Sequence, residues 1–250
     1  MASRLSAANR LLGVLPKTAY QRVLADLAPV ALKTGDVLYE PGRAIRYVYF
    51  PIDCVICLLT KDEGQKPVDV GLIGHEGMLG VSFALGATDS VLRAAVRSSG
   101  TALRMDAARF QTEFLRCLSW QRELFRYTNS QLALVRQAVA CHCFHRAEAR
   151  VACCLLMTSD RVGAEEFQQD QDSMAGSLGL TRSTVSMCAG HLRELKLISY
   201  ARGKIRILDR KQLEAAACEC YEYGKVLDAL SDRVTRSQRG DSNARVRKSR

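Results

Sequence analysis

Residues 171–199, in the last third of the 250-residue chain, read QDSMAGSLGLTRSTVSMCAGHLRELKLIS. Asp170, directly before this stretch, is placed to cap a helix, because its carboxylate can accept hydrogen bonds from the free amides of a first turn. Gly179 can adopt the left-handed conformation that ends such a helix in a sharp turn. Thr181 is then placed to cap a second helix. The stretch therefore predicts two helices joined by a tight turn.

The two predicted helices each have a clear inner side. Met174 and Leu178 share one side of the first helix, and Val185, Ala189 and Leu192 recur at i, i+4 and i+7 in the second. Near the start of the second helix, the outward side chains are then Arg182, Ser183, Ser186 and Met187. This arrangement is typical of a helix-turn-helix, whose second helix presents such residues to base edges in the major groove of DNA.

The predicted DNA contacts come from both helices and from the basic hairpin that follows them. Arg182 can make a pair of hydrogen bonds with a guanine, and hydroxyl side chains can bind bases or phosphates. The hairpin would form a wing that follows phosphates without reading sequence. The full predicted set is Gln171, Thr181, Arg182, Ser183, Thr184, Ser186, Met187, Arg202, Lys204 and Arg206. The alternative is a pair of ordinary core helices with solvated arginines.

The formal net charge of +10 is concentrated near the C-terminal end. Residues 231–250 carry seven Arg or Lys against two Asp, and residues 171–210 carry seven basic against three acidic side chains. This distribution indicates a polyanionic partner bound by one end of the molecule. Residues 231–250 also have almost nothing to bury, so a disordered basic tail is expected there.

Composition excludes several classes of protein. With 48% apolar and 25% charged residues, the chain is typical of globular proteins of one or two domains. No apolar run approaches the roughly 18 residues of a membrane-spanning helix, and the N-terminal apolar run is shorter than the core of a signal peptide. A cytoplasmic protein without membrane contact is therefore expected. No P-loop, catalytic triad or paired-carboxylate motif is visible, so an enzyme is not expected.

Upstream of the helix-turn-helix, the pattern of apolar residues and turn signals changes twice. Residues 5–28 predict short helices around Pro16, and from about Val30 to Arg104 short apolar runs alternate with Gly, Pro and Asp signals. Seven or eight short strands of this kind indicate a small β-sandwich or barrel. After Asp106 the pattern becomes helical and remains so into the helix-turn-helix.

One predicted helix is apolar on two sides. Its first line recurs at intervals of seven and consists of Leu118, Phe125, Leu132 and Val139. Its second line, about 200° away, consists of Trp120, Tyr127, Leu134 and Cys141. One side can pack on the β-domain and the other on a second copy of the chain, which predicts a homodimer through the first line. The alternative is that both sides are covered within one chain.

The run from about Asn9 to Tyr223 resembles the Crp/Fnr family of bacterial transcription regulators. The motifs that carry the resemblance are GDVLYEPG (35–42), YVYFP (47–51), VGLIGHEGMLGV (70–81), LLMTSDRVG (155–163), GLTRSTVS (179–186), LISYARGKIRILDR (197–210) and LEAAACECY (213–221). The resemblance implies an α+β fold with an N-terminal β-roll of the cyclic-nucleotide-binding type, a long dimerisation helix and a C-terminal winged helix-turn-helix. Domains are expected at 1–144 and 145–230, followed by the tail at 231–250. A homodimer on an inverted-repeat site in double-stranded DNA, with RNA polymerase as a further partner, is implied as well.

Members of this family that bind cyclic nucleotides hold the ribose with a Gly-Glu-Leu segment and the phosphate with a later Arg-Ser/Ala-Ala segment. The segments here that resemble them, and so form the predicted effector pocket, are Gly77, Met78, Leu79, Arg93, Ala94 and Ala95. Met78 stands where the resemblance implies a carboxylate, and a thioether cannot accept the same hydrogen bonds. Cyclic AMP is therefore not expected to bind. An unknown small effector and no effector at all both stay open, and no cofactor is predicted.

The ten cysteines are expected to be reduced, and one pair of residues offers a rival sensor chemistry. Cys141 and His145 lie at i and i+4 at the end of the long helix, so a metal-binding or redox-responsive regulator is an alternative, beside a plain helix end without metal. Cys218 and Cys220 are expected in one final helix, about Lys211–Leu230, on sides too far apart to bind one ion together. A further alternative, of a different class, is a ligand-binding regulatory module that acts through protein contacts.

Overall fold

The computed structural model describes residues 8–60 and 68–227, so the predicted tail at 231–250 lies outside the described residues. The N-terminal half holds two antiparallel sheets. One has the order β1-β7-β3 and the other β2-β6-β4-β5. Their bounds are β1 (Ala28–Leu32), β2 (Val37–Tyr39), β3 (Tyr47–Pro51), β4 (Val55–Thr60), β5 (Val68–Ile73), β6 (Arg93–Ser98) and β7 (Gly100–Asp106). The predicted β-domain is confirmed, with seven strands in the described residues.

Short helices close one end of this β-domain. Their bounds are α2 (Arg10–Gly13), α3 (Lys17–Asp26), α4 (Val81–Ala84) and α5 (Ala107–Arg116). The core under them gathers Phe50 from β3, Phe110 from α5 and Trp120 from the next helix, with ring centroids 5.3 to 6.5 Å apart. Aromatic rings bury much apolar area, so this contact fixes the start of the following helix against the sheets.

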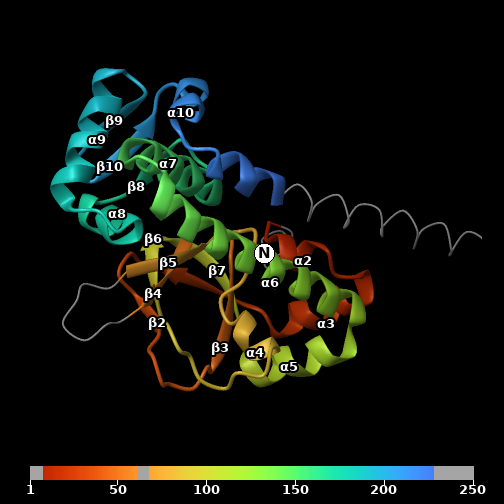
Figure 1. Cartoon of the computed structure of the whole chain (residues 1–250). Helices are drawn as coiled ribbons and strands as arrows, with labels where there is room; N and C mark the ends of the chain where they lie inside the picture. The colour runs from red at the N-terminus through yellow and green to blue at the C-terminus, as the bar shows by residue number, and fades with distance from the viewer. Residues whose placement is uncertain (1–7, 61–67, 228–250) are drawn as a thin grey trace, which may run out of the picture.

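The long helix α6 (Leu118–Phe144) passes between the N-terminal sheets and the C-terminal helices (Figure 1). Its two apolar lines differ in burial, as their spacing on opposite sides of the helix predicts. Of one line, Trp120, Tyr127 and Cys141 are buried and Leu134 is half-buried. The other line is exposed, with Leu118 69%, Phe125 50%, Leu132 46% and Val139 63% accessible. One side of α6 therefore packs within the chain, and the other is open in the single chain.

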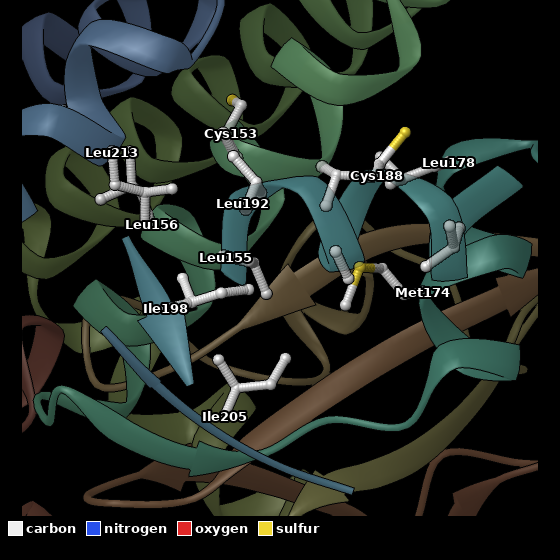
Figure 2. Close-up of a cluster of buried hydrophobic side chains, with 14 of the residues drawn as sticks. Cys153, Leu155, Leu156, Met174, Leu178, Cys188, Leu192, Ile198, Ile205 and Leu213 are labelled. Carbon is white, nitrogen blue, oxygen red and sulfur yellow. The ribbon is translucent and has the colours of Figure 1, made fainter. Parts of the chain in front are cut away.

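The C-terminal half is a helix-turn-helix with a three-stranded sheet of order β8-β10-β9. Its elements are α7 (Ala147–Val162), β8 (Glu166–Gln168), α8 (Gln171–Leu178), α9 (Arg182–Glu194), β9 (Ile198–Ala201), β10 (Lys204–Ile207) and α10 (Arg210–Ala216). Figure 2 shows side chains from these elements pointing toward one another, among them Leu155, Met174, Leu192, Ile198 and Ile205. Strand β8 is an addition to the sequence prediction, which has only the β9–β10 hairpin.

The predicted final helix at Lys211–Leu230 is wrong as one continuous element. Helix α10 ends at Ala216, Ala217 is extended, and residues 220–227 form a separate helical segment. The amide of Cys218 donates to the carbonyl of Ala149 on α7, 3.3 Å away. This contact with α7 takes the place of a hydrogen bond within the helix, so tertiary packing overrides the local helical pattern. Residues 228–230 lie outside the described part.

Polar contacts join the two halves of the chain. Arg97 of β6 and Asp69 of β5 form a buried ion pair with 2.6 Å between Nη1 and Oδ2. The hydroxyl of Ser177 on α8 accepts from Arg97 Nη2 at 2.9 Å and donates to Asp69 at 3.3 Å. On α7, Arg161 lies 3.4 Å from the carboxylate of Glu76. The helix-turn-helix is therefore held against the N-terminal sheets through α7 and α8.

Within the described residues, none of the helices combines the length and the apolar character needed to cross a lipid bilayer.

Candidate nucleic-acid interface

The helix-turn-helix is built from the caps and the turn that the sequence predicts. Asp170 accepts from the amide of Ser173 at 2.7 Å and caps α8. Gly179 has φ 57°, a left-handed conformation that favours glycine and lets the chain leave α8 sharply. Thr181 accepts from the amide of Thr184 at 3.1 Å and caps α9. Local chemistry thus fixes where α9 begins and in which direction it points.

Packing then fixes which side of α9 meets solvent. Val185, Ala189 and Leu192 are buried against the C-terminal core, and Cys188 joins them. Met187, on the other side, is 69% exposed. The remaining predicted contacts of the two helices are exposed at Thr181, Arg182, Ser183 and Ser186 and half-buried at Gln171 and Thr184. The start of α9 is therefore a polar, basic surface on a helix whose other side is core.

Arg182 has an acidic neighbour on the preceding helix. Its Nη1 lies 3.4 Å from Oδ2 of Asp172, and both side chains are more than half exposed. Exposed ion pairs of this kind contribute only about 0.2–1 kcal/mol, because solvent screens them. A guanine, which offers two acceptors to one guanidinium, can therefore compete for Arg182.

The wing carries less free positive charge than its sequence suggests. The antiparallel pairing of β10 with β8 places Arg206 opposite Glu166, and that carboxylate pairs with both Arg206 (2.7 Å) and Lys204. The hydrogen bond from Lys204 lowers the pKa of Glu166 below its ordinary value. Arg202 lies at the turn of the hairpin, with φ 51°, and is exposed. Sequence reasoning missed Glu166, because it did not identify β8 as the partner strand of the hairpin.

The exposed apolar line on α6 has one further member. Val135 is 48% exposed and lies three residues after Leu132 and four before Val139. Val135 does not belong to the seven-residue repeat, but residues three and four positions apart are neighbours on a helix surface, so it lies beside Leu132 and Val139. These five exposed side chains form an apolar stripe on α6, which is continuous from Leu132 to Val139.

The segments of the predicted effector pocket are packed with the protein's own side chains. A Cβ atom at Gly77 would lie 2.2 Å from Oη of Tyr127 on α6. Met78 is fully buried in the aromatic core beside α5 and α6, whereas Leu79 and Ala94 belong to a second core cluster. Both sides of the loop are therefore occupied, and the predicted pocket stays a prediction.

The second predicted segment begins at the surface. Arg93 lies 3.4 Å from Glu40 in an exposed ion pair, and Ala95 is half-buried in β6. Glu40 also lines a surface pocket formed by residues 37–40, 43–44, 46–47 and 49, which includes none of the six predicted effector residues. The structure thus does not gather these six residues around that pocket.

Cys141 and His145 lie together, and two further cysteines join them. The expectation that Cys218 and Cys220 are too far apart to bind one ion is wrong, because the chain is not helical at Cys218. Hydrogen bonds from the thiols of Cys141 and Cys153 lower the pKa of Cys218 well below its usual range. No spacing rule within one helix could have found this cluster, since its members meet through a bend in the chain.

Comparisons with known proteins agree with this architecture. Residues 149–216 match the Crp-like helix-turn-helix domain. FixK2 from Bradyrhizobium japonicum is 15% identical with a TM-score of 0.66, over 77% of this chain and 98% of that one. A putative Crp/Fnr-family regulator from Eubacterium rectale is 15% identical with a TM-score of 0.63, over 83% and 97%. A CRP-family regulator from Thermus thermophilus is 19% identical with a TM-score of 0.62, over 76% and 96%.

The comparison with curated proteins finds no match. The family match covers the part of the chain in which the caps, the turn and the exposed start of α9 lie. The structural matches extend the likeness to the β-domain and the long helix. The protein therefore carries a Crp-like helix-turn-helix domain within the fold of the Crp/Fnr transcription regulators.

Proposed function

We propose that the protein is a sequence-specific DNA-binding transcription regulator that acts as a homodimer. The observation that carries this proposal is the start of α9, where polar and basic side chains face solvent on a helix anchored by Val185 and Leu192. A rigid helix with such an end fits the major groove. Of these side chains, Arg182 is the one that can recognise a guanine through paired hydrogen bonds.

The open side of α6 supports the dimeric part of the proposal. Five large apolar side chains are exposed along it, which is unfavourable for a lone helix in water. A second copy packed on this stripe would cover it and relate two α9 helices by a two-fold axis. Recognition helices so related bind half-sites about 34 Å apart, or one turn of DNA. The proposal thus predicts an inverted-repeat site.

Replacement of Arg182 by Ala tests the DNA-reading role. We expect affinity for the specific site to fall by about 1–3 kcal/mol per half-site, because the paired contact with guanine is lost. Arg193→Ala is the matched control, since Arg193 is exposed in the last turn of the same helix. Fluorescence anisotropy with DNA from upstream of the protein's own gene, against a shuffled duplex, measures both variants.

Two outcomes would count against the DNA-reading role. Equal losses for Arg182→Ala and Arg193→Ala would show that α9 contributes charge but no recognition. No preference of the unaltered protein for any natural upstream sequence over shuffled DNA would favour the alternative, a regulatory module that works through protein contacts.

Replacement of Leu132 by Asp tests the dimer. A carboxylate in the centre of the apolar stripe would be buried without a partner on association, so we expect a monomer. Leu85→Asp is the control, because Leu85 is similarly exposed (54% against 46%) but lies at the end of α4. Sedimentation velocity should give a folded monomer for the first variant and a dimer for the second. A folded Leu132→Asp dimer would exclude this interface.

A further inference from the structure

Four side chains with metal-binding atoms meet where the long helix ends. Cys141 lies in the last turn of α6, and His145 is the residue that caps that helix at its C-terminal end. Cys218 follows α10 in the non-helical segment, and Cys220 begins the next helical segment. The three Sγ atoms and a ring nitrogen of His145 all lie within 4.8 Å of one another. Residues 77 positions apart in sequence thus converge on one point.

Two of the six distances between these atoms match the edges of a zinc tetrahedron. Sγ of Cys141 lies 3.7 Å from Sγ of Cys218, and Sγ of Cys220 lies 3.4 Å from Nδ1 of His145. A tetrahedral zinc ion with Zn–S near 2.3 Å and Zn–N near 2.0 Å has S···S edges of about 3.8 Å and S···N edges of about 3.5 Å. The cysteines are free thiols, with sulfurs well beyond the roughly 2.0 Å of a disulfide.

Two polar side chains, Glu219 and Gln137, lie beside the ligands of the cluster. Nε2 of His145 lies 3.7 Å from Oε1 of Glu219, while Nδ1 faces Cys220. Histidines that bind metals commonly offer one ring nitrogen to the ion and the other to a carboxylate. On another side, Nε2 of Gln137 donates to Sγ of Cys220 at 3.2 Å. An amide donor of this kind is a compatible neighbour for the thiolate, which is the form of the sulfur that binds metal.

Burial sets this cluster apart from an exposed group of polar residues. The three cysteines are 7 to 9% exposed and border the C-terminal core, whereas the His145 side chain is 22% exposed and leaves a path for entry. Packing alone would account for small buried thiols. It does not account for an imidazole whose Nδ1 faces a thiol and whose Nε2 faces a carboxylate.

We propose that Cys141, His145, Cys218 and Cys220 form a binding site for a single zinc ion. The ligands would be three thiolates and Nδ1 of a neutral imidazole, and the protons displaced from the thiols would pass to solvent. Atoms that all lie within 4.8 Å of one another enclose one ion, and not the larger body of a four-iron cluster. The site is independent of the proposed DNA-binding function, because none of its ligands lies on α8, α9 or the wing.

A zinc ion here would fasten the chain after α10 to the end of α6. His145 is followed after one residue by the start of α7, so the ion would lie where the long helix joins the C-terminal half. Its position predicts that metal binding stiffens this joint and holds the bend at 217–219.

The first test uses the full-length protein as purified, without metal in the growth medium beyond trace zinc. Native mass spectrometry and elemental analysis should give one zinc per chain. After removal of metal with a chelator under reducing conditions, Co(II) should give the strong visible bands of tetrahedral coordination and a near-ultraviolet band from thiolate, and Zn(II) should then displace it.

Variants identify the ligands. Cys218→Ser and His145→Gln should each lose the tetrahedral Co(II) spectrum, and circular dichroism checks that they are folded. Cys143→Ser is the matched control and should keep the spectrum, because Cys143 is exposed on the same turn of α6 and lies outside the cluster. Glu219→Gln should weaken zinc binding by less than the roughly 10- to 100-fold typical of a hydrogen-bonded outer partner, because the Glu219 carboxylate is 83% exposed and lies 3.7 Å from Nε2 of His145. Glu222→Gln, exposed and paired with Lys225, should not.

Several results would overturn the site. Failure of the reduced, metal-free protein to bind either Zn(II) or Co(II) at one equivalent would do so, whatever the variants show. An octahedral Co(II) spectrum or an iron–sulfur absorption spectrum of the isolated protein would also overturn it. So would a protein mass lower by two hydrogen atoms, with peptide mapping that places a disulfide between Cys141 and Cys218. A spectrum equally strong in Cys218→Ser and Cys143→Ser would also exclude the proposed ligands.

Discussion

The start of α9 and the loop from Gly77 to Leu79 differ in the exposure of their side chains to solvent. On α9, one side of the helix is core, so the residues opposite are necessarily exposed, as Met187 is. The loop, in contrast, lies between Tyr127 of α6 and the aromatic core that surrounds Met78. Tyr127 of α6 fills the space beside Gly77, and Met78 is fully buried. The first segment has a free side for a partner, and the second is occupied by the protein itself.

Periodicity predicts an exposed surface better than it predicts a cavity. An amphipathic helix with one buried stripe leaves the other side to solvent whatever covers the stripe. A pocket requires, in addition, that distant segments leave a space, and at Gly77 the occupying group comes from Tyr127, fifty residues later in sequence. Local pattern carries no information on that encounter.

The largest effect is expected at Asp69, where the N-terminal half, which holds the loop, contacts the C-terminal half, which holds α9. Asp69→Ala removes one partner of the buried pair and leaves the Arg97 guanidinium uncompensated, so we expect the free energy of unfolding to fall by about 3–5 kcal/mol. Urea unfolding followed by circular dichroism measures the loss.

The double variant Asp69→Leu with Arg97→Met sharpens this result. It removes both charges, and similar substitutions of buried pairs are often neutral or stabilising. Recovery of most of the stability would show that the single variant suffers from an unpaired charge. A double variant as unstable as the single one would show instead that Arg97 and Asp69 hold the two halves together through their contacts with Ser177.

A single methyl group added at Gly77 and one added on α9 should have opposite effects. Gly77→Ala places a Cβ atom 2.2 Å from Tyr127, and such overpacking costs about 1–3 kcal/mol of stability. Gly190→Ala on α9 meets nothing within 4 Å, and alanine in place of glycine within a helix stabilises by roughly 0.5–1 kcal/mol. Thermal unfolding of both variants, side by side, makes the measurement. Equal shifts in Tm would remove the contrast between the two regions.

The smallest effect is expected from cyclic AMP. Because Met78 offers no carboxylate and is packed in the core, we expect no saturable heat on titration and no change in DNA affinity. Isothermal calorimetry with 5′-AMP as the control ligand makes the measurement. Saturable binding of cyclic AMP, absent with 5′-AMP, would mean that this segment opens to receive a ligand.

Sequence was most informative where the decisive contacts are local. Asp170 and Thr181 each accept from an amide three residues later, and Gly179 forms its turn through its own left-handed conformation, so these capping and turn roles could be predicted. The role of Glu166 could not be predicted, because it depends on the pairing of β8 with β10. The bend at 217–219 could not be predicted either, since the hydrogen bond from the amide of Cys218 to α7 overrides a local pattern typical of a continuous helix.

The pairing of Glu166 with Lys204 and Arg206 has a consequence for counterions. Apart from Arg202 at the turn, the wing carries two positive charges and one negative charge, so along a phosphate backbone Lys204, Arg206 and Glu166 would together act as a single positive charge. Each phosphate neutralised on B-DNA contributes about 0.9 to the slope of log affinity against log salt. These three residues would then account for a slope of about 0.9 per protomer rather than about 1.8.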